Sequence, residues 1–377
     1  MKGEVMATIL LTGVTGAVGS CLAPLLKERG HKLICLVRGN NPVARLQKAL
    51  GNADDIAVFN GDVTLQNLGV CDCESRQWHG RIDKVFHCAS SIKFDEALAR
   101  EITCVNVCGT KNVLDFARNM RIPEVHYVST AYVAGDAETF SESDTDIGQK
   151  CRNVYERTKL EAEKLVKNWM HGKHSIYRLG IVVGDTVTGY TPFFNGYYGF
   201  LGSVWHLRQS FVSMSEHRLG EYASNGIALS ADGMLRLPIY GKFSLTSTLN
   251  ILPGDWVARV LTELVEVSAS GQVFHVVHPR PPKIRWLNDV SLEHLGIVEF
   301  RYGDSPDFDP KSLLGRFQRI FDRSTAQYLP YITRETKFAV SNLPSVLGGS
   351  YVSPPDVDEM FVAKLMGYAK SVNFGKD

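Results

Sequence analysis

A glycine-rich stretch, Thr12 to Gly19 (TGVTGAVG), constrains the fold of this chain more than any other feature. It follows a short apolar run, residues 7–11, that is typical of a buried parallel strand. It leads into residues 17–29, whose leucines recur at helical spacing until Gly30. The glycines therefore stand at a helix N-terminus, where free backbone N–H groups and the helix dipole favour a pyrophosphate and no Cβ blocks its approach. An ordinary glycine-rich turn would have the same composition, so the motif needs support from the rest of the chain.

The second expected strand, residues 32–37, completes a strand–helix–strand unit around the glycines. NAD-binding proteins place an acidic residue at the end of this strand, against a ribose hydroxyl, but this chain has Arg38 there. A guanidinium group matches a phosphate with two hydrogen bonds. We therefore expect Arg38, with Arg45 as a second donor, to bind the ribose 2′-phosphate of NADP(H). NAD(H) remains the alternative cofactor.

Short apolar runs alternate with helical patterns further along, which is typical of an α/β fold with a doubly wound parallel sheet, the Rossmann architecture. Further strands are expected at residues 55–59, 82–87 and 125–128. Asp62 follows the first of these, and small or hydroxyl-bearing residues follow the other two. Ligands bind beyond the carboxyl ends of strands in such sheets, so we expect these side chains to share one crevice with the glycine loop. Asp62 there either accepts from an adenine amino group or is an ordinary turn aspartate.

A helix is expected from about residue 155 to residue 170, with Tyr155 and Lys159 at its start. The spacing of four residues puts both side chains on one face, where the ammonium would lower the pKa of the phenol from about 10 and make it a better proton donor. On spacing alone, a surface Tyr–Lys pair is the more common outcome. The polar residues 136–150 are expected to form a surface loop, and residues 95–119 a long helix.

The charge balance argues against two classes of partner. Lysine and arginine number 41, aspartate and glutamate 40, and no dense basic run is present. Neither nucleic acid nor a membrane surface is therefore indicated. No stretch has the length of a membrane span, and the first apolar run is too short for a signal peptide, so we expect a cytoplasmic protein.

The eight cysteines are scattered along the chain. Those within apolar runs are expected to be small buried hydrophobes rather than parts of a disulfide framework: Cys35, Cys88, Cys104 and Cys108. Cys71, Cys73 and His79 lack a fourth ligand at usable spacing, so no metal site is expected.

Taken together, the motifs resemble, in order and over most of the chain, the extended short-chain dehydrogenase/reductase family. The matching pieces are TGVTGAVG, Gly61-Asp62, His87-Cys-Ala-Ser, Asn106 with Gly109-Thr110, Ser129-Thr130-Ala131-Tyr132-Val133 and Tyr155-x-x-x-Lys159. The resemblance implies a hydride-transfer site in which Thr130, Tyr155 and Lys159 form the catalytic triad and Asn106 is a further catalytic residue. It also implies cofactor contacts from Gly13, Thr15, Gly16, Ala17, Val18, Arg38, Arg45, Asp62, Val63, Cys88, Ala89, Ser90, Tyr155, Lys159, Leu179 and Ile181.

Three further segments narrow the resemblance within that family. CLVRG at residues 35–39, SSIKFDEAL at residues 90–98 and GDTVTG at residues 184–189 are similar to the fatty acyl-CoA reductases and to the thioester-reductase domains of carboxylic acid reductases and peptide synthetases. One departure concerns the sixth strand, which the family usually follows with Arg-Pro-Gly. This chain has Arg178-Leu179-Gly180, which leaves the local backbone there in question.

We expect two domains. Residues 1–189, with the sheet completed by residues 246–277, would form the NADP-binding domain, and residues 190–245 and 278–377 a smaller, mostly helical substrate lobe. Residues 190–213 of that lobe are rich in Phe, Tyr, Gly and Trp. This aromatic stretch either forms a second small core or provides the wall of a pocket for an apolar acyl chain.

The resemblance implies an NADPH-dependent oxidoreductase that reduces an acyl thioester, carried on coenzyme A or on a carrier protein, to an aldehyde. A nucleotide-sugar epimerase or dehydratase is the alternative, and Arg208 and Arg218 would then be candidates to clamp a diphosphate. A non-catalytic nucleotide-sensing scaffold is disfavoured by the complete triad. The sequence leaves a monomer and a homodimer equally open.

Overall fold

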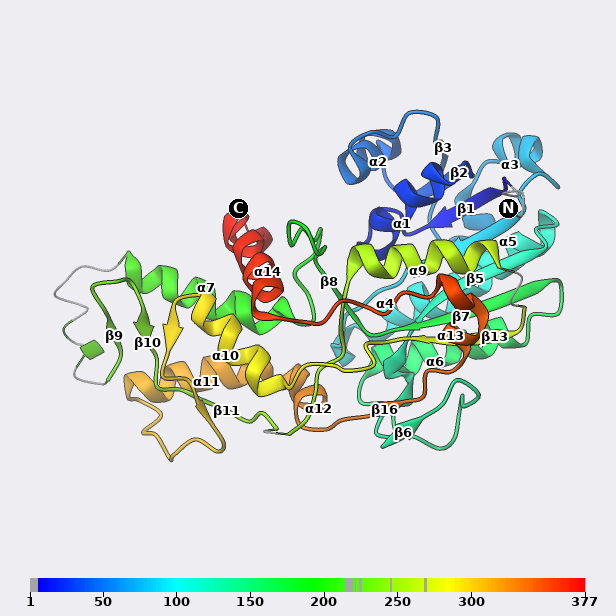
Figure 1. Ribbon diagram of the computed structural model, residues 1–377. Helices are drawn as coiled ribbons and strands as arrows, with labels where there is room; N and C mark the ends of the chain where they lie inside the picture. Colours follow the sequence, from blue (N-terminus) through cyan, green and yellow to red (C-terminus); the bar gives the residue numbers. More distant parts are fainter. Residues whose placement is uncertain are drawn as a thin grey trace. The chain divides into compact units, whose positions relative to one another are not determined.

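The parallel sheet expected from the sequence forms the centre of the first half of the chain. The computed structural model describes residues 6–213, 220, 222–223, 226–244, 246–267 and 270–376 (Figure 1). Seven parallel strands are hydrogen-bonded in the order β13-β7-β5-β4-β1-β2-β3. Their bounds are β1 (Thr8–Thr12), β2 (Lys32–Val37), β3 (Ala57–Asn60), β4 (Lys84–His87), β5 (Glu124–Thr130), β7 (Lys173–Leu179) and β13 (Gln272–Val276). The α/β fold class is confirmed.

Helices cover both faces of this sheet because successive strand residues point to opposite sides. Ile9 and Leu11 face a core that includes Leu22 and Leu26 of α1, whereas Leu10 faces the core that includes Val113 of α5. The first face is covered by α1 (Ala17–Glu28), α2 (Pro42–Leu50), α9 (Gly254–Glu266) and α13 (Asn342–Leu347). The second face is covered by α5 (Gly109–Asn119) and α6 (Val154–Lys167).

The helix expected over residues 95–119 is present in pieces of different winding. A 3-10 turn, η2 (Glu96–Leu98), leads into α4 (Ala99–Thr103), a π-helical segment, η3 (Cys104–Cys108), and then α5. A π-helical segment adds one residue per turn and is frequent at functional sites. This one carries Asn106.

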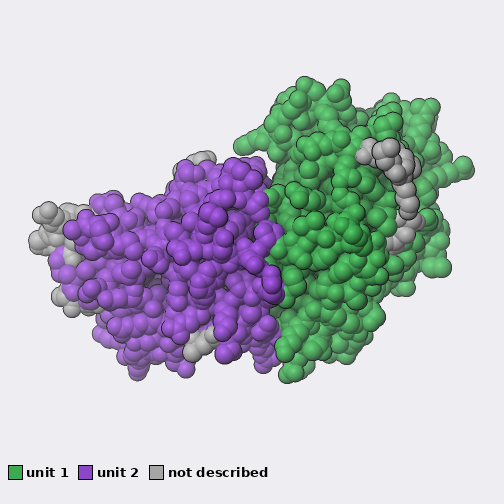
Figure 2. Space-filling view, in the orientation of Figure 1, with its two compact units in different colours: residues 1–182, 252–279, 336–354 green, residues 183–251, 280–335, 355–377 purple. Residues whose placement is uncertain are grey.

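The chain divides into two compact units, which Figure 2 shows in different colours. Unit 1 comprises residues 1–182, 252–279 and 336–354, and unit 2 comprises residues 183–251, 280–335 and 355–377. Residues 336–354 pack with the sheet, through Leu343 and Leu347, whereas the sequence placed them in the second lobe.

Unit 2 is mainly helical and has an aromatic interior. Its elements are β9 (Ala228–Leu229), β10 (Leu235–Arg236), β11 (Tyr240–Gly241), β14 (Ile297–Val298), β15 (Arg301–Tyr302), α7 (Tyr198–Val212), α10 (Ile284–His294), α11 (Leu313–Thr325), α12 (Leu329–Ile332) and α14 (Glu359–Ser371). Phe200 packs on Phe243 and Phe321, with ring centroids 5.7 and 6.5 Å apart. Phe194 packs on Tyr198 and on Tyr368 of α14. Of the two interpretations of residues 190–213, these contacts favour the second small core.

Three expectations from the sequence were wrong. Residues 136–150 are not simply a surface loop, because Thr139–Phe140 (β6) pairs with Lys337–Phe338 (β16) and Glu142 is buried. The sheet is completed by β13, within the expected residues 246–277, but the strand expected directly after residue 246 is not part of it: β12 (Ile251–Pro253) lies outside the seven strands. Finally, Cys108 is exposed, whereas the sequence placed it among the buried cysteines; separately, Cys71 and Cys73, at the start of α3 (Asp72–Trp78), are joined by a disulfide.

The described residues contain neither a membrane-spanning helix nor a metal-binding cluster. No helix there is long and apolar enough to cross a bilayer. No group of three or more His, Cys, Asp or Glu side chains is arranged to hold a metal ion in that part of the chain.

Candidate functional site

The glycine loop between β1 and α1 uses its three glycines in two different ways. Gly13 has φ +74°, and a Cβ there would lie 2.5 Å from the backbone nitrogen of Ala89, while a Cβ on Gly19 would overlap the carbonyl of Gly13. Gly16 is the N-cap of α1, with extended backbone and no side-chain cap, and a Cβ there would meet only Gly13 O, at 3.1 Å. Gly13 and Gly19 thus allow close backbone packing, and Gly16 leaves free space beside uncapped N–H groups. Such a cradle suits a dinucleotide pyrophosphate.

A buried hydrogen-bond chain connects this loop to β4 and the π-helical segment. The Ala89 amide donates to Thr12 Oγ1, which lies 2.7 Å from Nδ1 of His87. His87 Nε2 lies 3.2 Å from Thr110 Oγ1, and Thr110 donates onward to the carbonyl of Asn106. The Thr110 hydroxyl donates its only proton to the Asn106 carbonyl, so it can only accept from His87. His87 therefore donates from Nε2 and accepts at Nδ1. Burial lowers the pKa of His87 to about 3, with the charge of Lys159 as a smaller cause, so this imidazole is neutral.

Asn106 ties the loop after β4 to α6. Its Oδ1 accepts from the amide of Ser91 at 2.7 Å, and its Nδ2 donates to the carbonyl of Ser91 and to Thr158 Oγ1, both at 3.0 Å. Thr158 in turn donates to the carbonyl of Tyr155. Both N–H groups of the Asn106 amide are thus committed, which suits a positioning role better than the catalytic role implied by the resemblance.

Thr130 and Tyr155 lie together at the carboxyl end of β5. The Thr130 hydroxyl caps the turn that follows, accepting from the amide of Tyr132, and it donates to the carbonyl of Leu179 at 3.5 Å. Burial raises the pKa of Tyr155 to about 12, and the nearby Thr130 hydroxyl opposes this rise. Tyr155 is nevertheless partly exposed, with its ring beside Phe94.

Lys159 lies on the same helix but does not act on Tyr155 as the spacing predicted. Its Nζ donates to the carbonyl of Val128 at 2.7 Å and lies 4.2 Å from the ring centroid of Tyr127. The charge of Lys159 is not among the causes of the Tyr155 pKa, so the expected lowering of the phenol pKa by the ammonium was wrong. Burial instead lowers the pKa of Lys159 itself to about 7, against the charges of Glu163 and Cys88.

An ion pair behind the triad was missed by the sequence analysis. Glu163, one helical turn after Lys159, is fully buried and pairs with Arg178 of β7, with Nη2–Oε2 at 2.8 Å. Ser129, next to Thr130, donates to the same carboxylate at 2.5 Å. The sequence did contain a signal for this pair: an acid stands four residues after Lys159, on the helix face that carries Leu160 and Val166 into the core.

The backbone at Arg178-Leu179-Gly180, where the chain departs from the family pattern, is regular. The strand pairing continues there, with Val276 opposite Leu179.

The residues expected around the adenosine lie at the ends of β2 and β3. Arg38 is two-thirds exposed, and its Nη1 lies 3.5 Å from Asp62 Oδ2. The other oxygen of Asp62 accepts from the amide and hydroxyl of Thr64, both at 2.9 Å. Arg45 donates to the carbonyl of Arg38. Val63 packs its side chain against Gly109, and its carbonyl accepts from Asn112.

The other expected cofactor contacts fall into two groups. Those around the loops after β1 and β4 are partly exposed: Thr15, Ala17, Val18, Cys88, Ala89 and Ser90. Leu179, at the end of β7, is buried with its carbonyl 3.5 Å from Thr130 Oγ1, and Ile181 opens β8 (Ile181–Val183) and is partly exposed. Unit 1 therefore brings all the proposed cofactor residues to the carboxyl edge of its sheet.

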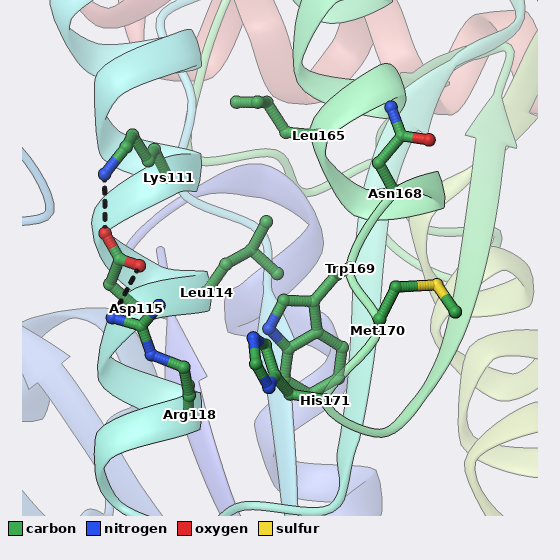
Figure 3. A pocket seen from close by; sticks show the side chains of 9 residues that line it. All are labelled: Lys111, Leu114, Asp115, Arg118, Leu165, Asn168, Trp169, Met170 and His171. Carbon is green, nitrogen blue, oxygen red and sulfur yellow. Dashed lines mark hydrogen bonds and ion pairs between the residues drawn. The ribbon is translucent and has the colours of Figure 1, made fainter.

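A separate pocket of about 310 Å³ lies on the helical side of unit 1 (Figure 3). It is lined by Lys111, Leu114, Asp115, Arg118, Leu165, Asn168, Trp169, Met170 and His171. These residues belong to α5 and to the end of α6, which leads into the amino end of β7. The pocket is therefore not part of the candidate site, and along its α5 wall Asp115 forms ion pairs with Lys111 and Arg118 of the same helix.

The two arginines proposed as a diphosphate clamp do not support that role. Arg208 of α7 donates to the carbonyls of Gly296 and Gly233, and so fastens the backbone of unit 2. Arg218 lies outside the described residues.

Comparison with known proteins agrees with this geometry. The family model of the NAD-binding male sterility proteins matches residues 11–261, about two-thirds of the chain and all the proposed cofactor residues. The chain belongs to this family. The resemblance to the fatty acyl-CoA reductase and thioester-reductase branch is thereby confirmed, and a nicotinamide cofactor follows from the family.

Curated relatives match over part of their length. Glycine betaine reductase ATRR of Emericella nidulans is 26% identical over 306 residues, which are 74% of this chain and 21% of that protein. Fatty acyl-CoA reductase 1 of Mus musculus is 29% identical over 144 residues, 33% of this chain and 28% of that protein. The chain thus spans about a fifth to a quarter of the length of these relatives.

Solved structures of the same fold match nearly the whole chain. The terminal R domain of the myxalamid PKS-NRPS pathway has a TM-score of 0.75 at 22% identity, covering 98% of this chain and 92% of that domain. UDP-galactose 4-epimerase has a TM-score of 0.61 at 17% identity, covering 97% of this chain and 99% of that one. At these identities the likeness concerns the fold alone.

Proposed function

We propose that this chain is an NADP(H)-dependent reductase that converts an acyl thioester to an aldehyde. The observation that carries the proposal is the placement, within one unit, of Thr130, Tyr155 and Lys159 at the carboxyl edge of the sheet that also holds the glycine cradle. The names of the relatives, a glycine betaine reductase and a fatty acyl-CoA reductase, support acyl reduction over epimerisation.

The side chains of Thr130 and Tyr155 can supply the hydrogen bonds and the proton that this reaction requires. Bound NADPH would supply a hydride to the acyl carbon. Thr130 and Tyr155 would hold the carbonyl oxygen by hydrogen bonds, and the Tyr155 hydroxyl would donate its proton to that oxygen as negative charge develops. The resulting hemithioacetal then breaks its C–S bond, which releases the aldehyde and the free thiol. A phenol with pKa about 12 remains protonated at neutral pH and so keeps the proton it must donate.

Preference for NADPH over NADH would come from Arg38. Its exposed guanidinium at the end of β2 is free to turn from Asp62 to a 2′-phosphate, and Arg45 lies beside it. The acyl donor would be a coenzyme A thioester or a carrier protein that bears the acyl group. Both a monomer and a homodimer are compatible with a site built within one unit.

The test is a turnover assay with two linked readouts. Purified protein is incubated with NADPH and a panel of acyl thioesters, and we expect loss of the reduced nicotinamide and release of free thiol in equal amounts. Tyr155→Phe should lose most turnover and keep cofactor affinity, whereas the control Tyr351→Phe should keep both. If no thioester is reduced but a nucleotide sugar is converted without net consumption of nicotinamide, the protein is an epimerase and the proposal of a thioester reductase is wrong.

A further inference from the structure

The surroundings of Lys159 are unusual for a lysine. The side chain is 2% exposed, and among the described residues no carboxylate forms an ion pair with its Nζ. The two contacts of the ammonium are the Val128 carbonyl, at 2.7 Å, and the face of the Tyr127 ring, whose centroid lies 4.2 Å away. Val128 and Tyr127 are consecutive residues of β5, so one strand supplies both contacts.

We propose that the Tyr127 ring is the positioning surface that holds the Lys159 ammonium at the carboxyl end of β5, directed towards the cofactor. The inference rests on the proposed function only in naming the cofactor as what Lys159 faces. Tyr127 touches neither substrate nor cofactor in this proposal and acts through Lys159 alone.

The count of hydrogen bonds shows why a ring is needed. An ammonium has three N–H donors, and Val128 accepts from one. The nearest acid on the helix, Glu163, acts on Lys159 through its charge but forms no direct ion pair with it, because Arg178 and Ser129 occupy its oxygens. The negative face of an aromatic ring within about 6 Å attracts a cation strongly where water is excluded. Tyr127 therefore partly replaces a direct ion pair and leaves an ammonium donor for a ligand.

Tyr127 is fixed in place by its own neighbours. It is 1% exposed and lies in the core on the α5 and α6 face of the sheet, with Val113 and Val166. Its ring lies 5.6 Å from the ring of His87, centroid to centroid. Burial raises the pKa of the Tyr127 hydroxyl well above 10, so the attraction comes from the ring and not from a phenolate.

Charged and titratable groups reach Lys159 from each element packed around it. Glu163, on α6, and Cys88, after β4, raise the lysine pKa, and burial lowers it to about 7. The charge of Lys159 in turn lowers the pKa of His87. Because a ring face favours the charged lysine, its loss lowers the pKa of Lys159 further.

The test follows the titration of Lys159 directly in the cofactor-free protein. Protein labelled with ¹⁵N-lysine is titrated by NMR, and Lys159→Met assigns the resonance. We expect the pKa of Lys159 to fall by about one unit in Tyr127→Leu, the size of a desolvated cation–π contact. Tyr127→Phe keeps the ring and should leave the titration unchanged.

A matched control removes another buried tyrosine from the same sheet. Tyr177 lies on β7, in the core of the opposite sheet face, so Tyr177→Leu loosens the sheet without touching Lys159. An unchanged Lys159 titration in Tyr127→Leu overturns the proposal, and so does an equal fall in Tyr177→Leu. In the assay, Tyr127→Leu should shift the high-pH limb of kcat down by the same amount. The NMR result stands whether or not an acyl thioester proves to be the substrate, so the two proposals fail separately.

Discussion

Arg178 contacts both carboxylate oxygens of Glu163, and neither side chain is exposed to solvent. The same guanidinium donates to the carbonyls of Ser141 and Asp144, and Ser129 donates to the carboxylate. One ion pair therefore fastens the end of β5, the helix α6 and the segment before that helix. The backbone that carries Thr130 and Lys159 depends on it.

Removing one member of this pair should cost much more than removing a surface pair. Glu163→Ala leaves a buried, uncompensated guanidinium and should lower the free energy of unfolding by about 3–5 kcal/mol. Asp115→Ala, which breaks the solvent-accessible pair with Lys111, should cost about 1 kcal/mol or less. Urea denaturation measures both. Similar costs for the two variants would show that the buried pair has no special structural role.

Gly16 allows cofactor binding to be separated from folding. Gly16→Ala is compatible with its backbone, φ −88° and ψ 172°, so the protein should fold, but the new Cβ occupies the proposed phosphate space. We expect nucleotide affinity to fall at least tenfold, or about 1.4 kcal/mol. Calorimetric titration with NADPH measures this, and thermal unfolding reports the fold.

Two other glycines serve as controls for Gly16. Gly13→Ala should lower stability as well, because of φ +74° and the clash with Ala89. Gly51, with φ +73° and no atom within 4 Å of a Cβ, gives the cost of the backbone strain alone. Unchanged affinity in Gly16→Ala would remove the glycine loop from the cofactor site.

Arg38→Ala tests the choice between the two nicotinamide cofactors. Loss of a charge-assisted contact to the 2′-phosphate should weaken NADPH binding by roughly 10- to 100-fold and leave NADH binding unchanged. The exposed Arg100 on α4 provides a control of the same charge change. Direct binding measurements with both nucleotides decide. Equal affinities for NADPH and NADH in the unaltered protein and in Arg38→Ala would contradict the assignment.

The sequence predicted those parts of the site that depend on local chemistry. Residue spacing within a short stretch of sequence is enough to place Gly13 and Gly16 between β1 and α1. It is also enough to place Tyr155 and Lys159 on one helix. The direction of the Lys159 side chain does not follow from spacing, because it depends on a carbonyl and a ring of β5, some thirty residues earlier in the chain.

Buried charges were also beyond sequence patterns. Glu142 lies in a polar stretch, yet it is buried because it accepts from the backbone of His275, Ser341 and Asn342, more than 130 residues away. An acid that caps distant backbone looks in the sequence like any exposed acid. The same holds for Glu163, whose partner Arg178 lies on a strand that is otherwise apolar near its end.

The buried chain through His87 predicts a distinctive pH dependence of stability. Above pH 6.5 His87 is neutral in both the folded and the unfolded chain. The buried hydrogen-bond chain therefore makes its full contribution to the free energy of unfolding at these pH values. As pH falls below 6.5 the unfolded chain takes up a proton, whereas the folded chain does not until about pH 3. Relative to His87→Asn, the protein should therefore lose about 1.4 kcal/mol of stability per pH unit in this window. Carboxylates titrate in both proteins, so the difference between their denaturation curves isolates His87.

Thr12→Val breaks the hydrogen bond to Nδ1 without removing the titrating group, and it gives the cost of the bond itself at high pH. A difference between the unaltered protein and His87→Asn that stays constant from pH 7 to pH 4 would mean that His87 accepts a proton in the folded protein.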